Sequence, residues 1–277
     1  MQKILKQLQV LVKQHAAEHI MSRYNHVAYS FKNDGSLVTE ADFAMQIAMI
    51  NSLKKHWPDY IVLGEEMNET EQQALLNCNS KGLWILDPLD GTSNFASGLP
   101  VFSVSIALVI NKEVVLGMIY DPSRNEVFSA IRGEGAWLNG HKLKSASERE
   151  LLSQCTAQID FKRLTPDMRV CLSREHPYAS QRNFGSGALD WCWLAAGRCQ
   201  VYIHGGQKLW DYVAGQLILD EAGGIARTFG GDQVFAMSLE PRSVMAAVNK
   251  TLFAQLQKYL TSMECRKKTG SSYLALY

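Results

Sequence analysis

Apolar positions divide the chain into stretches with helical and with extended periodicity. Over residues 2–30 the apolar side chains recur on one side at helical spacing, with His15 and His19 beside them. A second one-sided pattern predicts a helix over residues 41–54. A short extended piece over 37–39 separates the two predicted helices.

Short apolar runs bounded by Gly, Pro, Asn or Asp predict strands in the middle of the chain. They cover residues 60–63, 83–86, 101–110, 114–120 and 127–131, with a hairpin turn at 111–113. Beyond residue 151 we expect strands over 156–159, 169–172, 201–203 and 244–248, and helices over 188–196, 210–222 and 251–260. From residue 261 on, no clear periodicity is visible.

The order of these elements indicates α/β architecture in layers, without a strict βαβ rhythm. The pattern changes near residue 145, which predicts two subdomains. The first is an N-terminal α+β half over 1–145, and the second is a C-terminal α/β half over 146–265, followed by a tail over 266–277. A chain of 277 residues can bury a full core without disulfides.

Charge and composition argue against nucleic-acid and membrane partners. The chain has 28 Lys and Arg against 27 Asp and Glu, a net charge of +1, and lacks the basic stripe of a nucleic-acid or membrane binder. Its longest apolar run, 101–110, is about half of the ~20 residues that a membrane helix needs. The N-terminus lacks signal-peptide features, and the six cysteines lack zinc-site spacing. We therefore expect a soluble, cytoplasmic protein without a nucleic-acid or membrane partner.

Acidic side chains gather at three points where a predicted strand ends or a helix begins. These points are Gly64-Glu65-Glu66, Asp87-Pro88-Leu89-Asp90-Gly91-Thr92-Ser93 and Trp210-Asp211. In the second, Asp87 and Asp90 can face one point in space, and Leu89 between them offers only its carbonyl. Such a set of hard oxygen donors suits Mg²⁺ better than zinc. A helix beginning after Asp90 would also attract a phosphate, although Asp-Pro-x-Asp-Gly alone is equally typical of a surface turn.

Longer segments around these points carry a family resemblance. They are Lys32 with Leu37-Val38-Thr39-x-x-Asp42, Gly64-Glu65-Glu66, the run from Trp84 to Phe95, Gly133-x-Gly135-Ala136 with Asn139-Gly140, Leu209-Trp210-Asp211 with Ala214-Gly215, and Glu221-Ala222-Gly223-Gly224. In this order, from about residue 32 to 250, they resemble the signatures of the inositol monophosphatase family. The resemblance implies an αβαβα sandwich, Mg²⁺-dependent hydrolysis of a phosphate monoester, inhibition by Li⁺ and a homodimer.

The resemblance also implies a role for each matched residue. The metal ligands would be Glu65, Asp87, the Leu89 carbonyl, Asp90 and Asp211. Glu65 and the Thr92 hydroxyl would orient the attacking water, with Asp42 accepting a hydrogen bond from Thr92. The substrate would be contacted by Asp90, Gly91, Thr92, Ser93, Ser186, Gly187, His204 and Asp211. Glu66 is not a ligand in the family pattern and is expected to lie behind the site or at the surface.

One position departs from the family. Inositol monophosphatases carry an acidic residue seven positions before the aspartate of the Trp-Asp pair, where it contacts the inositol hydroxyls, and this chain has His204 there. A histidine cannot accept two hydroxyl hydrogen bonds as a carboxylate does. Inositol monophosphate is therefore the first expectation, with a 3′,5′-nucleotide bisphosphate, fructose bisphosphate or histidinol phosphate as alternatives.

Two further alternatives remain open from the sequence. Asp190 either contacts the substrate or lies on a helix surface, and Lys208 and Arg174 could meet a second phosphate. A function of another class, a non-catalytic binding or regulatory protein on the same fold, is disfavoured because every expected metal-binding side chain is present.

Overall fold

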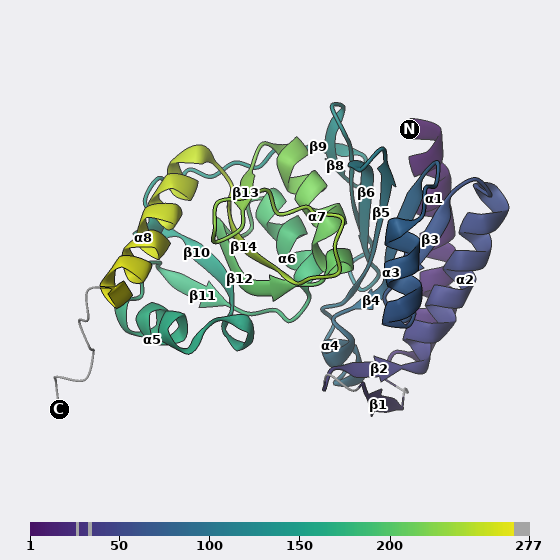
Figure 1. Ribbon diagram of the computed structural model, residues 1–277, viewed down its shortest axis with the longest axis horizontal. Coiled ribbons are helices and arrows are strands. Elements are labelled where there is room, and N and C mark those ends of the chain that lie inside the picture. The colour runs from purple at the N-terminus through teal and green to yellow at the C-terminus, as the bar shows by residue number, and fades with distance from the viewer. Residues whose placement is uncertain (26–27, 33–34, 269–277) are drawn as a thin grey trace.

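The protein is built as five alternating layers of helices and sheets. The computed structural model describes residues 1–25, 28–32 and 35–268 (Figure 1). The layers are, in order, α1 (Gln2–His15) with α2 (Glu40–His56), a seven-stranded sheet, α6 (Gly187–Ala195) with α7 (Leu209–Ala222), a five-stranded sheet, and α5 (Pro166–Glu175) with α8 (Lys250–Lys268). This arrangement confirms the predicted αβαβα sandwich.

The larger sheet contains the strands of the first half of the chain in sequence order. These are β3 (Ile61–Gly64), β4 (Leu83–Asp90), β5 (Ser103–Ile110), β6 (Glu113–Asp121), β7 (Glu126–Ile131), β8 (Gly135–Leu138) and β9 (His141–Leu143). Strands β3 and β4 are parallel, and the other neighbours are antiparallel. The predicted hairpin joins β5 to β6, with Asn111 and Lys112 in the left-handed conformation at its turn.

Both faces of this sheet are buried, which explains its nearly continuous apolar strands. In β4, Leu83 and Ile85 pack on the side of α6 and α7, whereas Trp84 and Leu86 pack on the side of α1 and α2. This alternation is the two-residue period of a strand. The sheet is therefore held rigidly between two apolar layers, and so is the carboxyl end of β4.

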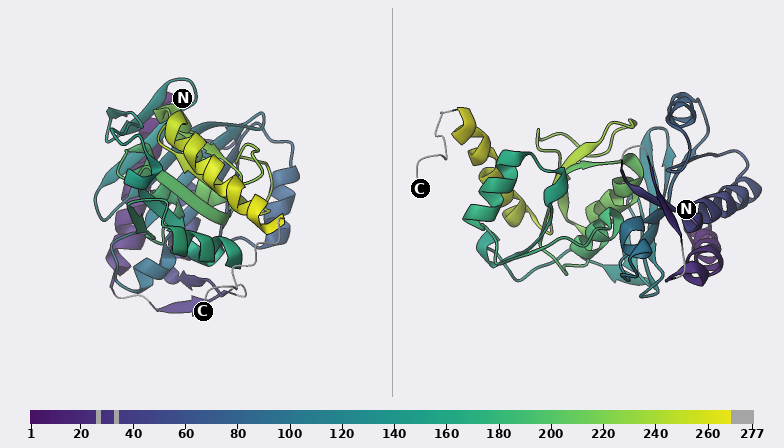
Figure 2. Two further views of the ribbon diagram at one scale, coloured as in Figure 1. Left: turned by 90° about the vertical axis from the view of Figure 1, so that its left-hand side faces the viewer. Right: turned by 90° about the horizontal axis from the view of Figure 1, so that it is seen from below.

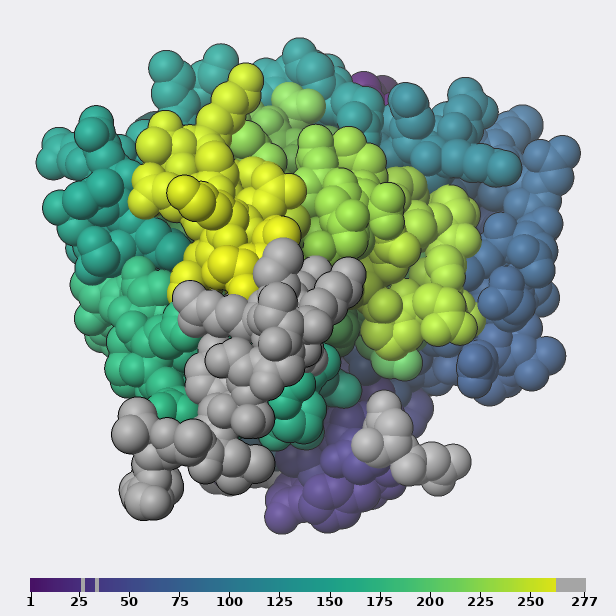
Figure 3. Space-filling model, turned by 60° about the vertical axis from the view of Figure 1, so that its left-hand side comes forward, coloured from purple at the N-terminus to yellow at the C-terminus, as the bar shows by residue number. Residues whose placement is uncertain are grey.

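The smaller sheet contains strands from the second half of the chain in the order β11-β10-β12-β14-β13. Their bounds are β10 (Thr156–Asp160), β11 (Ser180–Arg182), β12 (Val201–Gln207), β13 (Ile225–Arg227) and β14 (Arg242–Ala247). Helix α8 crosses this sheet on its outer side, as Figure 2 shows, and forms part of the molecular surface in Figure 3. The predicted boundary between subdomains near residue 145 stays a prediction.

Short elements complete the described chain. They are the antiparallel pair β1 (Tyr29–Phe31) and β2 (Leu37–Thr39), the helices α3 (Glu69–Asn77) and α4 (Thr92–Ala96), the π turn Ala16–Ile20, and the 3₁₀ turns Met21–Arg23, Leu152–Gln154 and Phe161–Arg163. Within the described ranges, no helix has both the length and the apolar character that crossing a bilayer requires.

Three predicted elements differ from the structure in extent or type. The first helix was expected over 2–30, but α1 ends at His15 and passes through the π and 3₁₀ turns to Asn25, whose φ of 68° ends the helical path. Residues 169–172 belong to α5 and not to a strand. Thr165 caps that helix and Pro166 stands at its first position, a combination typical of a helix start.

The third difference concerns the C-terminus. Helix α8 continues to Lys268, eight residues beyond its predicted end, so residues 266–268 of the predicted tail are helical. Residues 269–277 lie outside the described part of the chain. Strand β4 also extends through Asp90 and not only to residue 86, which matters for the site.

Candidate active site

Four helices begin beside the carboxyl end of β4. They are α2, α4, α6 and α7, and their first residues are joined by contacts among the predicted site residues. The N-terminus of a helix carries unpaired N–H groups and a partial positive charge, so it stabilises carboxylates and phosphates. The place where these helices meet is therefore suited to a cluster of negative charge.

An irregularity in β4 brings Asp87 and Asp90 together. Asp87 pairs with Ser105 of β5 and Asp90 with Ser103, and the register shifts between these pairs. Pro88 lacks a backbone donor, which is tolerated at such a bulge. The Asp87 carboxylate accepts a hydrogen bond from the Leu89 N–H at 3.0 Å, which fixes its orientation. In a regular strand, side chains three positions apart point to opposite faces of the sheet. The bulge changes this alternation, so that the Asp87 and Asp90 carboxylates lie on the same side.

Helix α7 adds Asp211 to this pair. Its carboxylate accepts the Lys208 N–H at 3.0 Å and so caps its own helix. The Ser105 hydroxyl donates to the Trp210 carbonyl at 3.0 Å, which ties the start of α7 to β5. One oxygen each of Asp87, Asp90 and Asp211 can be chosen so that all three lie within 4.8 Å of one another.

Asp90 is held by the start of α6. Its carboxylate accepts hydrogen bonds from the Ser186 hydroxyl, from the Gly187 N–H at 3.2 Å and from the Ala188 N–H at 2.9 Å. Ser186 and Gly187, predicted as substrate contacts, therefore position a predicted metal ligand. Ser93, predicted with them, is exposed.

The electrostatics of the cluster favour a bound cation. Burial, followed by the charges of Glu65, Asp90 and Asp211, raises the pKa of Asp87 well above its ordinary value. Burial and then Asp90 and Glu65 do the same for the pKa of Asp211. Burial raises the pKa of Asp90 to about 6 against its hydrogen bonds from α6. Carboxylates this close repel one another unless positive charge separates them.

Glu65 lies next to this cluster and is paired with a lysine. The Lys32 Nζ is 2.9 Å from Glu65 Oε1 and 2.6 Å from Glu66 Oε1. Burial tends to lower the pKa of Lys32, but the two glutamates raise it overall. The Glu66 side chain is 4% exposed, and burial and Glu65 raise its pKa to about 7 despite Lys32. The Glu66 side chain is thus buried, and its partner is Lys32, which the sequence motifs include without assigning it a role.

Thr92 and Asp42 meet as the resemblance implies. The Thr92 hydroxyl lies 3.1 Å from Asp42 Oδ1 and 2.9 Å from the Leu89 carbonyl, and its single proton serves one of them at a time. Asp42 also accepts the Thr39 N–H at 2.8 Å and the Thr39 hydroxyl at 2.5 Å in the capping box of α2. Burial raises the pKa of Asp42 to about 6 in spite of these bonds.

Gly91 connects β4 to α4 in a conformation that other residues avoid. Its φ is +85°, and a Cβ there would approach the Val101 carbonyl oxygen to 2.8 Å. Glycine is required on both counts. The N–H groups at the start of α4 are directed away from the helix and are not used within it.

His204 is engaged on both ring nitrogens. Its Nδ1 accepts the Gly206 N–H at 3.1 Å, and its Nε2 lies 3.2 Å from Asp160 Oδ2 on the neighbouring strand β10. This geometry assigns the proton to Nε2. Burial raises the pKa of Asp160, but the hydrogen bond from His204 lowers it overall. No sequence motif points to Asp160, since it lies beside His204 only through the pairing of β10 with β12.

Asp190 does not lie on a helix surface, which excludes one of the two alternatives that the sequence leaves open, and contact with the substrate stays a prediction. Asp190 is buried in α6 and accepts a hydrogen bond from Gln158 at 3.1 Å. Burial, and then the charges of Asp90 and Asp160, raise its pKa well above the usual range. Cys192, on the same helix, is also buried.

Comparison with known proteins decides the family. The model of the inositol monophosphatase family matches residues 1–263. The chain belongs to this family. It is 38% identical over 237 residues to the protein named Nus factor SuhB of Pasteurella multocida, covering 82% of this chain and 87% of the relative.

Two solved structures extend the comparison. An IMPase of Thermotoga maritima is 29% identical with a TM-score of 0.82, covering 95% of this chain and 99% of the other. SaIMPase-II, solved with inositol monophosphate bound, is 25% identical with a TM-score of 0.79, covering 96% of this chain and 98% of the other. These two structures share the layered fold of this chain.

Proposed function

We propose that the protein is a Mg²⁺-dependent phosphatase that hydrolyses a small phosphate monoester. The observation that carries this proposal is the cluster of Asp87, Asp90 and Asp211, with Glu65 beside it, at the start of four helices. Carboxylates held this close together raise one another's pKa values, and a bound cation offsets that cost. Membership of the family supports the same activity.

The donor set fits Mg²⁺. All candidate ligands, namely Glu65, Asp87, the Leu89 carbonyl, Asp90 and Asp211, offer oxygen, and Mg²⁺ prefers oxygen to nitrogen or sulfur. Bound Mg²⁺ would neutralise the phosphate, lower the pKa of a nucleophilic water and stabilise the leaving alkoxide. The side chains around it are fixed in advance by the Leu89, Lys208, Gly187 and Ala188 N–H groups.

The remaining site residues would orient water and substrate. The Thr92 hydroxyl, with Asp42 as its acceptor, and the Glu65 carboxylate can hold a water in line with the phosphate. The N–H groups of Gly91 and Thr92 at the start of α4 can bind phosphate oxygens. No covalent intermediate with the protein is required, since the water attacks directly.

Removing the Thr92 hydroxyl tests the proposed water positioning. We expect Thr92→Val to lower kcat about a hundredfold, because a positioned proton acceptor contributes about 10²–10⁴. The matched control is Thr92→Ser, which keeps the hydroxyl and should stay within a few fold of wild type. Steady-state phosphate release measures both, and equal rates for the two variants would exclude Thr92 from this role.

The expected substrate is inositol monophosphate. The solved complex of SaIMPase-II supports this choice, and the Asp160 carboxylate beside His204 supplies an acidic acceptor where the family's usual acid is replaced. A panel of inositol 1-phosphate, fructose 1,6-bisphosphate, histidinol phosphate and adenosine 3′,5′-bisphosphate tests it. We expect the highest kcat/KM on inositol 1-phosphate. A preference for another ester would identify that ester as the substrate and leave the proposed mechanism unchanged.

Lithium is expected to inhibit the reaction. Li⁺ carries half the charge of Mg²⁺ and can occupy an oxygen-lined Mg²⁺ position without supporting the same charge stabilisation. Millimolar LiCl should lower the rate of phosphate release, with the same concentration of KCl as the control. Unchanged rates in LiCl would contradict the expectation.

A second candidate function is partner binding. The observation that favours it is the name Nus factor SuhB, carried by relatives 34–38% identical to this chain. The two functions separate in a folded variant without phosphatase activity, such as Asp90→Asn. If that variant replaces the wild-type protein in cells that depend on it, binding is the required function. If it fails, catalysis is required.

The net charge of the chain bears on its partners and its location in the cell. The nearly neutral charge supports a small-molecule substrate and no direct nucleic-acid or membrane partner, and it is consistent with a cytoplasmic protein. The homodimer implied by the family resemblance stays a prediction.

A further inference from the structure

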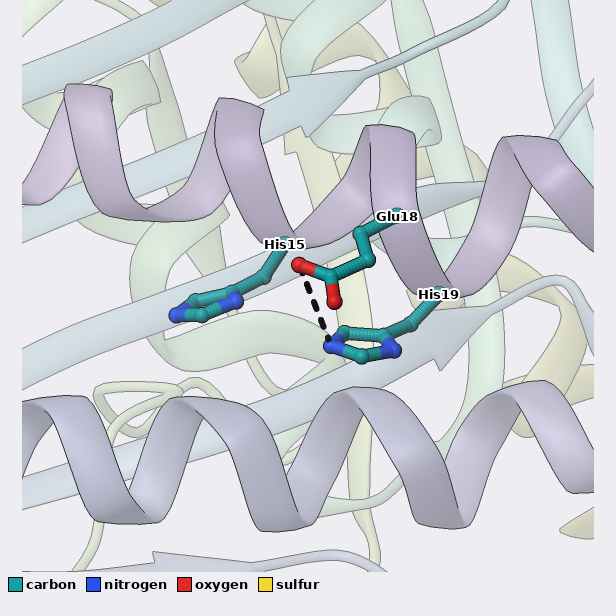
Figure 4. Close-up of side chains that lie close together, drawn as sticks. All are labelled: His15, Glu18 and His19. Atoms are coloured by element: carbon teal, nitrogen blue, oxygen red, sulfur yellow. Dashed lines mark ion pairs between the residues drawn. The ribbon is translucent and has the colours of Figure 1, made fainter.

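His15, Glu18 and His19 form a second cluster of potential metal ligands. They come from the end of α1 and from the π turn Ala16–Ile20, and their side chains gather beside this helical segment (Figure 4). One ligand atom from each residue can be chosen so that all three lie within 4.8 Å of one another. The two imidazole rings stack with centroids 5.7 Å apart, and Glu18 Oε2 lies 3.8 Å from His19 Nε2.

The orientation of His15 leaves one ring nitrogen without a partner. Its Nε2 is 2.8 Å from the Ser52 hydroxyl of α2, whereas its Nδ1 is buried and has no hydrogen-bond partner among the described residues. Buried polar atoms are almost always satisfied, so this one calls for an explanation. Histidines that bind metals commonly donate their other N–H to a neighbouring group, which fixes the ring. Ser52 is placed to accept such a bond from Nε2, which leaves the lone pair of Nδ1 free to bind a metal ion.

The protonation state of His15 suits this role. Burial and then the neighbouring His19 lower the pKa of His15, against the opposing effect of Glu18. The ring is therefore neutral near pH 7, which is the form that coordinates metals. The backbone here is also unusual, because it forms a π turn. Such turns are rare in helices, and many of those that occur lie at functional sites.

We propose that His15 Nδ1, the Glu18 carboxylate and a nitrogen of His19 bind a divalent transition-metal ion of the zinc class. Two imidazoles and a carboxylate are typical zinc donors, and water would fill a fourth position. This donor set differs from the all-oxygen set at Asp87, Asp90 and Asp211, so the two sites select different ions. The ion would join α1 to its π turn and, through Ser52, to α2.

Zinc titration of the full-length protein tests this site. Mg²⁺ at saturation occupies the carboxylate site, and isothermal titration calorimetry then follows Zn²⁺ binding. We expect one site whose affinity falls at least about tenfold in His19→Ala and in Glu18→Gln, and about tenfold in Ser52→Ala, which removes only the group that orients His15. The matched control is His141→Ala, an exposed histidine on β9 that should leave the affinity unchanged.

Two outcomes would overturn the proposal. One is the same Zn²⁺ affinity in His19→Ala as in wild type, and the other is an equal loss in His141→Ala, which would indicate scattered surface histidines. Electron paramagnetic resonance of bound Cu²⁺ gives an independent readout, with two imidazole nitrogens expected in wild type and one in His19→Ala. Phosphate release with Mg²⁺ should be unchanged in His19→Ala, so failure of this site and failure of the proposed activity are distinguishable.

Discussion

Replacing Asp90 with asparagine is expected to lower Mg²⁺-dependent phosphate release about a thousandfold. Loss of one charged ligand removes several kcal/mol of transition-state stabilisation, and each 1.36 kcal/mol corresponds to a factor of about ten in rate. The fold should survive, because an amide oxygen can still accept the Ser186 hydroxyl and the Ala188 N–H and loses only the bond from Gly187. Initial rates at saturating substrate measure the effect.

Asp211 offers the matched comparison. Asp211→Asn should cause a similar loss of rate, whereas Asp220→Asn, on the same helix α7 but away from the cluster, should stay within a few fold of wild type. Circular dichroism and the thermal midpoint show whether each variant is folded. A folded Asp90→Asn protein with normal turnover would remove Asp90 from the metal site.

Magnesium is expected to stabilise the protein strongly at neutral pH and weakly in acid. In the metal-free protein the pKa values of Asp87 and Asp211 are raised and that of Asp90 is about 6, whereas in the unfolded chain they are near 4. Between these values the folded state holds more protons than the unfolded state. The stability of the metal-free protein therefore falls as pH rises through this window, and it stays lowered above it.

Mg²⁺ reverses that loss where the carboxylates are charged. At a hundredfold excess over its Kd, a ligand adds about 2.7 kcal/mol, or roughly 5 to 10 °C in Tm for a chain of this size. At about pH 5 Mg²⁺ must displace protons, so its effect should shrink. Thermal unfolding at both pH values with MgCl₂ or EDTA, at constant ionic strength, measures this. An equal Mg²⁺ shift at both pH values, or the same shift in Asp90→Asn, would contradict the account.

The sequence predicts most of the layers because their apolar patterns are local. Strand β5 and helices α2 and α7 follow from periodicity together with the residues that begin or end them. The sequence predicts the metal-ligand candidates because they lie at strand ends or helix starts within short motifs. The structure then explains how Asp87 and Asp90 share one side, through a bulge that the sequence marks only by Pro88.

Other features depend on contacts between segments that lie far apart in the sequence, and the periodicity of apolar residues does not predict such contacts. The apolar residues of α5 favour a strand when taken alone, whereas Thr165 and Pro166 before them are typical of a helix start. The ion pairs of Lys32 join residues more than 30 positions apart, and Asp160 meets His204 only because β10 pairs with β12. The π turn at Ala16–Ile20 interrupts a pattern that reads as one continuous helix.

Phosphate release from inositol 1-phosphate by the wild-type protein, with MgCl₂ and with EDTA, tests the central claim most directly. We predict turnover that depends on Mg²⁺, disappears with EDTA and returns when Mg²⁺ is added back. The substrate panel run in parallel separates a different ester from the absence of activity. No turnover on any of these esters by folded, Mg²⁺-bound protein would contradict the phosphatase function and leave partner binding as the function of this fold.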